Sequence, residues 1–160
     1  MRAINMIGLH HSASSWGNAF EIDKWHKEFD PPFDCIGYHF VVLNGVLRPN
    51  DLKFKTMIGS IESGRDLNRA GAHIKGHNKN SIGICMIHDD GDTYEEAMFK
   101  SLFYLCKELM EKFELPASAF KGHYELDPEN KPNCPGFDVE WFRYALQHKN
   151  NWNFWDRFCV

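Results

Sequence analysis

Short apolar runs alternate along the chain with stretches in which apolar residues recur at helical spacing. The run at residues 4–10 predicts a buried strand, and residues 19–29 have the spacing of an amphipathic helix. Asn18 followed by Glu21 is a capping-box pair, which predicts that the helix begins there. A further isoleucine-rich run at 81–88 predicts a central strand.

The segments around these elements carry turn and cap signals. Residues 35–49 have the pattern of a β-hairpin with an Asn-Gly turn at 44–45, and residues 61–67 predict a short edge strand. Thr93 and Glu96 form a second capping-box signature before a long amphipathic helix. The apolar positions of that helix are Met98, Leu102, Leu105, Leu109 and Phe113.

The remaining pattern defines the fold class. Residues 69–80 are glycine-rich and polar and predict a loop, residues 119–126 predict a last short strand, and residues 138–148 predict a last helix. Strands and helices therefore alternate, which predicts one α/β domain over residues 1–160 with a central mixed sheet flanked by helices. The aromatic tail 149–160 is expected to pack on this domain.

Composition excludes several classes of function. The net charge of −4 disfavours a nucleic-acid partner, which would need a dense basic surface. No run of 18 apolar residues is present, so we expect no membrane insertion. The start of the chain lacks the apolar stretch and small-residue cleavage site of a secretory signal. We therefore expect synthesis in the cytoplasm without export through the secretory pathway.

The cysteines do not form a disulfide pattern. There are five, an odd number, and they are widely scattered. Cys85 and Cys106 lie in apolar contexts typical of small buried residues. Cys134 is different, because it lies in a loop rich in proline and asparagine where no core requires it.

Residues that bind metals gather at predicted strand ends. His10 and His11 follow the first strand, His123 follows the last, and Cys134 comes shortly after. Two imidazoles and one thiolate suit zinc, and three protein ligands leave a fourth position for water, as in catalytic sites. Neighbouring side chains of a strand point to opposite faces, so His10 and His11 cannot easily serve the same site. Alternation alone leaves open which one faces the site.

Four motifs, in order, resemble a known family. They are LHHSAS, IGYHFVV, GRDLNRAGAHIKGHNKNSIGICM and GHYEL followed by CPGFD. The chain resembles the type 2 N-acetylmuramoyl-L-alanine amidases, which include phage endolysins of the T7 lysozyme kind and are related to the peptidoglycan recognition proteins. The resemblance spans residues 4–142. It implies a zinc hydrolase that cleaves the amide between N-acetylmuramic acid and L-alanine in peptidoglycan.

The resemblance also implies roles for single residues. His10, His123 and Cys134 match the ligands of one zinc ion at one edge of the sheet, and His11 fills a variable position. Tyr38 matches the tyrosine near the water that the metal activates. His73 matches a histidine in the loop that borders the substrate cleft.

The other site residues are less directly matched. The catalytic lysine of these endolysins stands two residues before the cysteine, where this chain has Pro132. Lys131 stands three residues before Cys134, so a rearranged loop would have to bring it to the site. Arg65 and Asn80 are candidates for contacts with the glycan or peptide, with a structural role in their loop as the alternative.

Three functions follow for comparison. The first is a phage or prophage endolysin that acts on peptidoglycan as a monomer, after release from the cytoplasm to the cell wall. The second is a non-catalytic module that binds peptidoglycan. The filled ligand positions His10, His123 and Cys134 disfavour that second reading, and the displaced Lys131 favours it. The third is a toxin-like amidase effector with the same chemistry.

Overall fold

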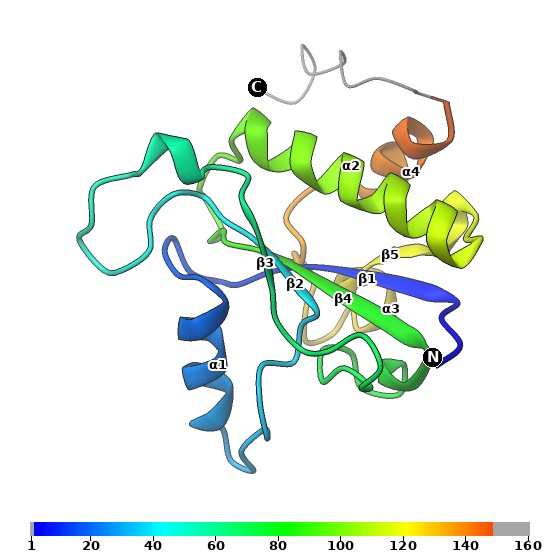
Figure 1. Cartoon of the computed structure of the whole chain (residues 1–160), viewed down its shortest axis with the longest axis horizontal. Coiled ribbons are helices and arrows are strands. Elements are labelled where there is room, and N and C mark those ends of the chain that lie inside the picture. The colour runs from blue at the N-terminus through cyan, green and yellow to red at the C-terminus, as the bar shows by residue number, and fades with distance from the viewer. Residues whose placement is uncertain (1, 149–160) are drawn as a thin grey trace.

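The computed structural model describes residues 2–148, in which five strands form one mixed sheet (Figure 1). The strand order is β3-β2-β4-β1-β5. The strands β1, β2, β4 and β5 run parallel, and β3 is antiparallel to its neighbour β2. Their bounds are β1 Met6–His11, β2 Phe40–Val42, β3 Ile61–Ser63, β4 Ser81–Met86 and β5 Phe120–Gly122. The predicted α/β class with a mixed sheet is confirmed.

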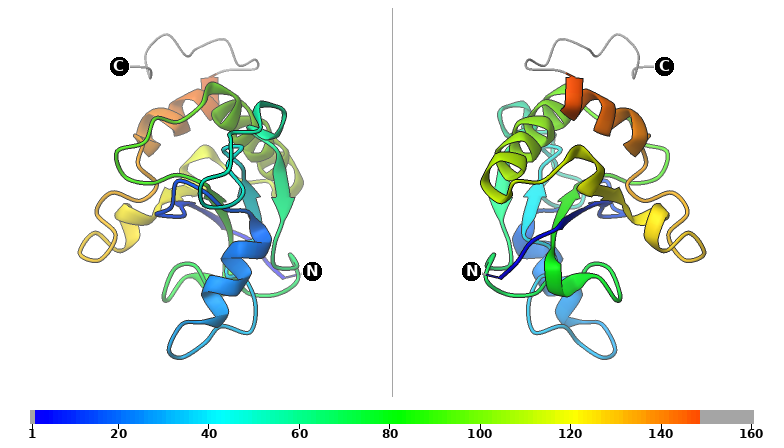
Figure 2. Two further views of the ribbon diagram at one scale, coloured as in Figure 1. Left: turned by 90° about the vertical axis from the view of Figure 1, so that its left-hand side faces the viewer. Right: turned by 90° about the vertical axis from the view of Figure 1, so that its right-hand side faces the viewer.

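Helices cover the two faces of this sheet unequally. The helices α2 and α4 lie on one face, and α1 lies on the other (Figures 1 and 2). The short helix α3 directly follows β5. The bounds are α1 Ala19–Lys27, α2 Glu96–Phe113, α3 His123–Leu126 and α4 Val139–His148, with single 3-10 turns at Lys55–Met57, Asn78–Asn80 and Ala117–Ala119.

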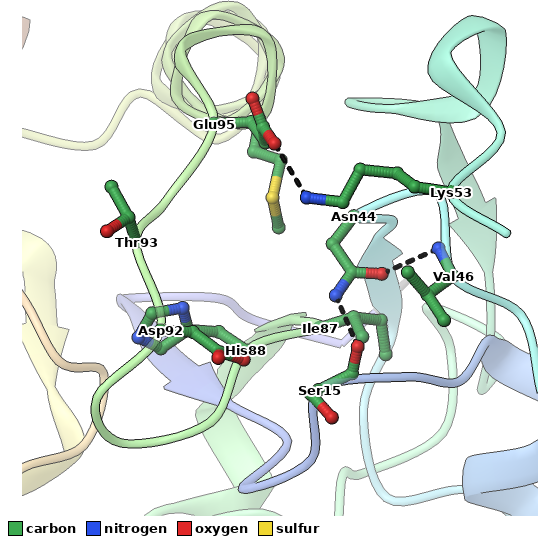
Figure 3. A pocket seen from close by; sticks show the side chains of 10 residues that line it. Ser15, Asn44, Val46, Lys53, Ile87, His88, Asp92, Thr93 and Glu95 are labelled. Carbon is green, nitrogen blue, oxygen red and sulfur yellow. Dashed lines mark hydrogen bonds and ion pairs between the residues drawn. The ribbon is translucent and has the colours of Figure 1, made fainter. Parts of the chain in front are cut away.

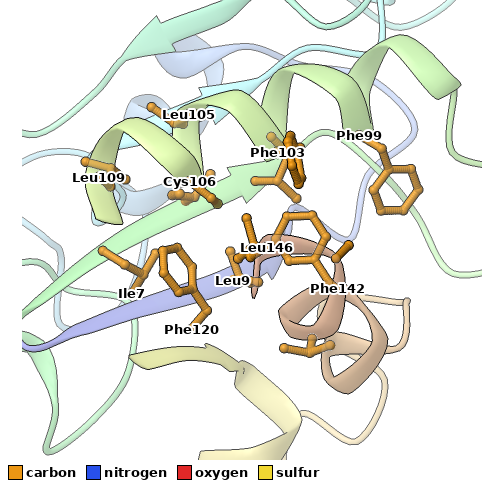
Figure 4. Close-up of a cluster of buried hydrophobic side chains, with 14 of the residues drawn as sticks. Ile7, Leu9, Phe99, Phe103, Leu105, Cys106, Leu109, Phe120, Phe142 and Leu146 are labelled. Atoms are coloured by element: carbon orange, nitrogen blue, oxygen red, sulfur yellow. The ribbon is translucent and has the colours of Figure 1, made fainter. Parts of the chain in front are cut away.

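The larger part of the core lies between the sheet and the pair α2 and α4 (Figure 4). Ile7 and Leu9 of β1 face this cluster, where they pack with Phe103, Phe120 and Phe142. Full burial of one such aromatic side chain stabilises the fold by about 1.5–3 kcal/mol. Because side chains alternate along a strand, His10 lies on the opposite face of β1, towards α1. Alternation along the strand left open which of His10 and His11 faces the α1 side, and the structure shows that it is His10.

The signals for the first helix are confirmed. The Asn18 side chain accepts a hydrogen bond from the Glu21 backbone N–H at 2.9 Å, so it caps α1 as expected. The edge strand expected within 61–67 is β3, and the central strand expected within 81–88 is β4.

The predicted hairpin at 35–49 is wrong. The segment contributes β2, but the antiparallel partner of β2 is β3 and not the residues that follow the Asn-Gly pair. Asn44 instead stabilises a local turn, since its side chain accepts from the Val46 N–H and donates to the Ser15 carbonyl. Gly45 supplies the positive φ of +86° that this turn requires.

Two further local predictions need correction. The Thr93–Glu96 capping box does not form, because α2 begins at Glu96 after Glu95, which makes no side-chain cap bond. The strand predicted at 119–126 ends at Gly122, and the chain turns into α3 at His123. Glu125 explains this turn, because its carboxylate accepts from the Gly122 N–H at 2.7 Å and closes the first turn of the helix.

Two expectations concern the whole chain. In the part of the chain that the structure describes, no helix is long and apolar enough to cross a membrane. The aromatic tail 149–160 lies outside the described residues, so its packing stays a prediction, as does the extent of the domain over residues 1–160.

Candidate metal centre

Three side chains predicted to bind metal converge at the ends of β1 and β5. One ligand atom from each of His10, His123 and Cys134 lies within 4.8 Å of the other two, and all three residues are buried. His10 Nδ1 is 3.0 Å from His123 Nδ1 and 3.9 Å from Cys134 Sγ. His10 comes from β1, His123 from the first residue of α3, and Cys134 from the loop after it.

The geometry of this cluster fits a zinc ion. Zinc bonds of about 2.0–2.3 Å in a tetrahedron place neighbouring ligand atoms about 3.3–3.6 Å apart, close to the separations observed. A backbone N–H of His11 donates to Cys134 Sγ at 3.4 Å, which favours a thiolate. His11 contributes this backbone group, and its ring contacts the His88 carbonyl rather than the cluster.

Burial shifts the pKa values of all three side chains of the cluster. It lowers the pKa of His10 well below the ordinary histidine value, with a further contribution from the neighbouring His73. Burial and the cation of Lys131 lower the pKa of His123 to about 4. Both imidazoles are therefore neutral at pH 7, as metal ligands must be. Burial raises the pKa of the Cys134 thiol to about 11, so binding of a metal displaces its proton.

The cluster lies beside a cleft of about 370 Å³. Polar residues that line it include Tyr38, His123 and Lys131. An apolar wall comes from α1 and the loop after it. The residues of this apolar wall are Ile22, Trp25, Phe29 and Phe33.

Tyr38 lies beside the cluster. Its ring centroid is 5.1 Å from that of His10, and its side chain lines the cleft. Burial, together with the nearby thiols of Cys85 and Cys134, raises the pKa of Tyr38 well above 10. The phenol is thus a hydrogen-bond donor at neutral pH.

The loop after α3 brings Lys131 to the cleft despite its displacement in the sequence. The Lys131 backbone N–H donates to the Asp127 carbonyl at 2.9 Å, and its own carbonyl accepts from Cys134 N–H at 3.3 Å. This helix-like turn places the exposed lysine on the same side as His123, where it lines the cleft. Pro132 leaves this arrangement undisturbed, because no backbone N–H is needed at that position.

The three predicted substrate-binding residues are placed differently from one another. His73 borders the cleft, but its two ring nitrogens contact His10 and Ser81. Arg65 lines a separate hollow and donates to the carbonyls of Ile36, Cys35 and Ala70 and to the Asp34 carboxylate. Asn80 lies just before the start of β4, whereas His10 pairs with Cys85 near the end of that strand.

The pattern of the sequence missed part of the cleft wall. His26 is buried, lines the cleft and accepts the Gly37 N–H at 2.9 Å. Phe29 is 49% exposed at the rim. The helical spacing within residues 19–29 predicts an apolar stripe. The sequence pattern of such a stripe is the same whether it faces a cleft or a core.

A second hollow of about 410 Å³ lies between the turn at Asn44 and the start of α2 (Figure 3). An ion pair of 2.7 Å between Lys53 and Glu95 crosses it. His88 is buried beside it and stacks on Tyr94. None of the site residues predicted from the sequence lines this hollow.

The fold is that of amidases and peptidoglycan recognition proteins. N-acetylmuramoyl-L-alanine amidase LysC from Clostridium intestinale superposes with a TM-score of 0.73 and 26% identity, over 92% of this chain and 88% of that one. Drosophila PGRP-LB has a TM-score of 0.65 at 20% identity, over 98% and 87% of the two chains, which shows the fold alone.

The sequence comparisons add the family. The model of the N-acetylmuramoyl-L-alanine amidase family matches residues 1–137. The endolysin of Escherichia phage T7 is 33% identical over 126 residues, which cover 75% of this chain and 70% of that protein. An uncharacterized protein of Haemophilus influenzae is 37% identical over 100 residues, 52% of this chain and 84% of that one. The chain belongs to the N-acetylmuramoyl-L-alanine amidase family and is an enzyme of that class.

Proposed function

We propose that this enzyme depends on one zinc ion and cleaves the amide between the lactyl group of N-acetylmuramic acid and L-alanine in peptidoglycan. The observation that carries the proposal is the buried cluster of His10, His123 and Cys134, whose ligand atoms lie within 4.8 Å of one another beside a cleft. The fit of these atoms to tetrahedral zinc supports the metal, and family membership supports the bond.

The protein groups around the cluster suit amide hydrolysis. When bound, zinc supplies Lewis-acid chemistry, polarising a carbonyl and making water more acidic. In this proposal the Tyr38 phenol, which lines the cleft, donates a hydrogen bond to the oxygen that becomes negative during attack. The Lys131 ammonium adds positive charge at the same cleft and is a proton donor for the departing amine of alanine.

The cleft fits a substrate with a polar and an apolar side. The peptide or sugar would pass between Lys131 and the apolar wall of α1, which Phe29 extends to the rim. One chain supplies the complete ligand set, so the proposed active form is a monomer.

We further propose a phage or prophage origin and a role in lysis, in which the enzyme reaches the wall after release from the host cytoplasm. Similarity to the endolysins of Escherichia phage T7 and Enterobacteria phage T3 supports this. A gene for a pore-forming protein next to this one is the expected finding. A neighbouring immunity gene would instead favour the toxin-like effector.

Product analysis tests the proposed reaction. Zinc-loaded protein is incubated with purified peptidoglycan, and soluble products are identified by mass spectrometry. We expect peptides with new L-alanine amino termini and glycans with free lactyl groups. Cleavage of a glycosidic bond or of a bond within the peptide would contradict the proposal.

The Cys134→Ser variant separates an enzyme from a binding module. We expect loss of zinc and of amide cleavage, because the thiolate ligand is replaced by a weakly coordinating hydroxyl. Cys106→Ala is the control, since Cys106 is a buried residue of α2 in the hydrophobic core, away from the metal cluster. If the unsubstituted protein binds peptidoglycan without releasing products, and Cys134→Ser binds equally well, the binding module is the correct function.

A further inference from the structure

A chain of buried polar side chains lies behind the metal cluster on the α1 face of the sheet. His10 Nε2 lies 2.9 Å from His73 Nδ1, and His73 Nε2 lies 3.0 Å from the Ser81 hydroxyl. His10, His73 and Ser81 are 1%, 8% and 0% exposed. His10 thus has one ring nitrogen towards the metal cluster and the other towards His73.

The direction of the hydrogen bonds follows from the far end of this chain. The Ser81 hydroxyl donates its single hydrogen to the His77 carbonyl at 2.8 Å, so it must accept from His73 Nε2–H. His73 Nδ1 then carries a lone pair and accepts from His10 Nε2–H. A neutral imidazole holds one hydrogen, which leaves the lone pair of His10 Nδ1 pointing at His123 and Cys134.

Three glycines form the slot that holds the His73 ring. A Cβ atom at Gly71 would lie 2.4 Å from His73 Cδ2, and one at Gly83 would lie 2.6 Å from His73 Cγ. A Cβ at Gly8 would lie 3.0 Å from both His73 and His10. Any side chain at these positions would displace the ring, so the imidazole lies flat against the backbone of β1 and β4 with little freedom to turn.

We propose that His73 is a positioning residue, which together with Ser81 fixes His10 in the tautomer and orientation that bind zinc through Nδ1. The inference rests on the metal centre proposed above and reassigns His73, which the resemblance placed at the substrate. Both its ring nitrogens are engaged within the protein, so neither is left for a ligand. Hydrogen bonds of this kind raise the basicity of a ligating histidine and typically change metal affinity 10–100-fold.

Zinc affinity of the full chain tests this proposal without any substrate. The dissociation constant is measured by competition with a chromophoric chelator, and the site is monitored by the absorption spectrum of bound Co²⁺. His73→Ala should weaken zinc binding about 10–100-fold and alter the Co²⁺ spectrum. His73→Asn should bind more tightly than His73→Ala, because its amide oxygen replaces the Nδ1 acceptor.

Two further variants separate positioning from a general loss of packing. Ser81→Ala should weaken zinc binding less than His73→Ala, because the ring stays but its tautomer is no longer fixed. Cys106→Ala, at a buried core position of α2, should leave the dissociation constant unchanged even if thermal unfolding shows lower stability. Unfolding of each metal-free variant by circular dichroism confirms that it is folded.

The outcomes are distinct. Unchanged zinc affinity and Co²⁺ spectrum in a folded His73→Ala protein would overturn the inference while leaving the metal centre intact. Should His73→Ala not fold, unchanged affinity in Ser81→Ala would overturn it equally. If the unsubstituted protein binds no zinc, the metal centre itself is wrong and the inference fails with it.

Discussion

Tyr38 supplies a neutral hydrogen-bond donor to the cleft, because its raised pKa keeps the phenol protonated. We predict that Tyr38→Phe lowers the rate of amide cleavage about 10²–10³-fold, the usual cost of removing one donor to a developing oxyanion. Zinc affinity should be unchanged, since the phenol is not a ligand. Rates on a soluble muropeptide and zinc competition give the two values. Equal rates for the two proteins would exclude Tyr38 from catalysis.

Lys131 lines the cleft but does not belong to the metal cluster, so its positive charge is available for catalysis and is not required for zinc binding. We predict that Lys131→Met lowers cleavage at least about tenfold, because general acid catalysis and charge stabilisation each contribute 10²-fold or more where they operate. The control is Lys100→Met, which removes the same charge from an exposed position on α2. If both variants cleave the muropeptide at one rate, the lysine role lies elsewhere.

The convergence of His10, His123 and Cys134 in one cluster could be predicted from sequence, but the surroundings of that cluster could not. His10, His123 and Cys134 stand in motifs that fix their residue types and order. Ser81 gave no signal beyond starting a strand, since its contact with His73 depends on how the loop 69–80 folds back over β4. Hydrogen bonds of that kind are set by three-dimensional packing and leave no periodicity in the chain.

At the scale of elements, the position of α1 on the sheet depends on a neutral His26. Its ring accepts the Gly37 N–H, and burial lowers its pKa to about 4. The unfolded chain takes up this proton near pH 6.5, before the folded protein does. The contribution of His26 to the free energy of unfolding is therefore constant above pH 6.5 and is lost as the pH drops from 6.5 to 4.

We predict that His26→Asn reduces this acid sensitivity, because the amide accepts the same N–H without titrating. The difference in slope should stay below the ceiling of about 1.4 kcal/mol per pH unit for one proton, since the ring borders the cleft and solvent screens its charge. Urea unfolding of the metal-free proteins at pH 7 and 4.5 measures it. Burial also lowers the pKa of His39 to about 4, so both proteins retain some dependence of stability on pH. If stability depends on pH equally in the two proteins, His26 is not a source of the acid sensitivity.

The strands β1 and β4 contribute to the metal site through the absence of side chains. We predict that Gly83→Ala weakens zinc binding about tenfold, because its Cβ displaces the His73 ring, to which the three atoms nearest that position belong. In a His73→Ala background the same substitution should have little effect, since the clash is gone. This double-mutant cycle measures the coupling of the two residues. Additive losses would show that Gly83 acts independently of His73.

Elements with a strong apolar periodicity could be predicted from the sequence. Elements that depend on which strand pairs with which could not. The helix at α1 and the strands β1 and β4 follow from apolar spacing and the Asn18 cap. The hairpin at 35–49 failed because an Asn-Gly pair specifies a tight turn but not the partner of the preceding strand. The hydrogen bonds of Asn44 to Ser15 and Val46 satisfy that turn within a longer loop instead.

At the scale of the whole molecule, the sheet order brings distant segments to one site. β1 lies between β4 and β5, which places His10 next to His123 although they are 113 residues apart. The alternation of strands and helices predicted the α/β class, because crossover helices must cover a parallel sheet. The order of the strands could not be predicted, since it depends on which buried faces fit together.

The central claim is that one zinc ion held by His10, His123 and Cys134 makes this fold an amidase. The most direct measurement is to strip the protein of metal with a chelator, add zinc stepwise, and record bound metal and cleavage of peptidoglycan together. We predict no cleavage in the stripped protein and a linear return that saturates at about one zinc per chain. Full cleavage without metal, or restoration that does not follow zinc occupancy, would contradict the account.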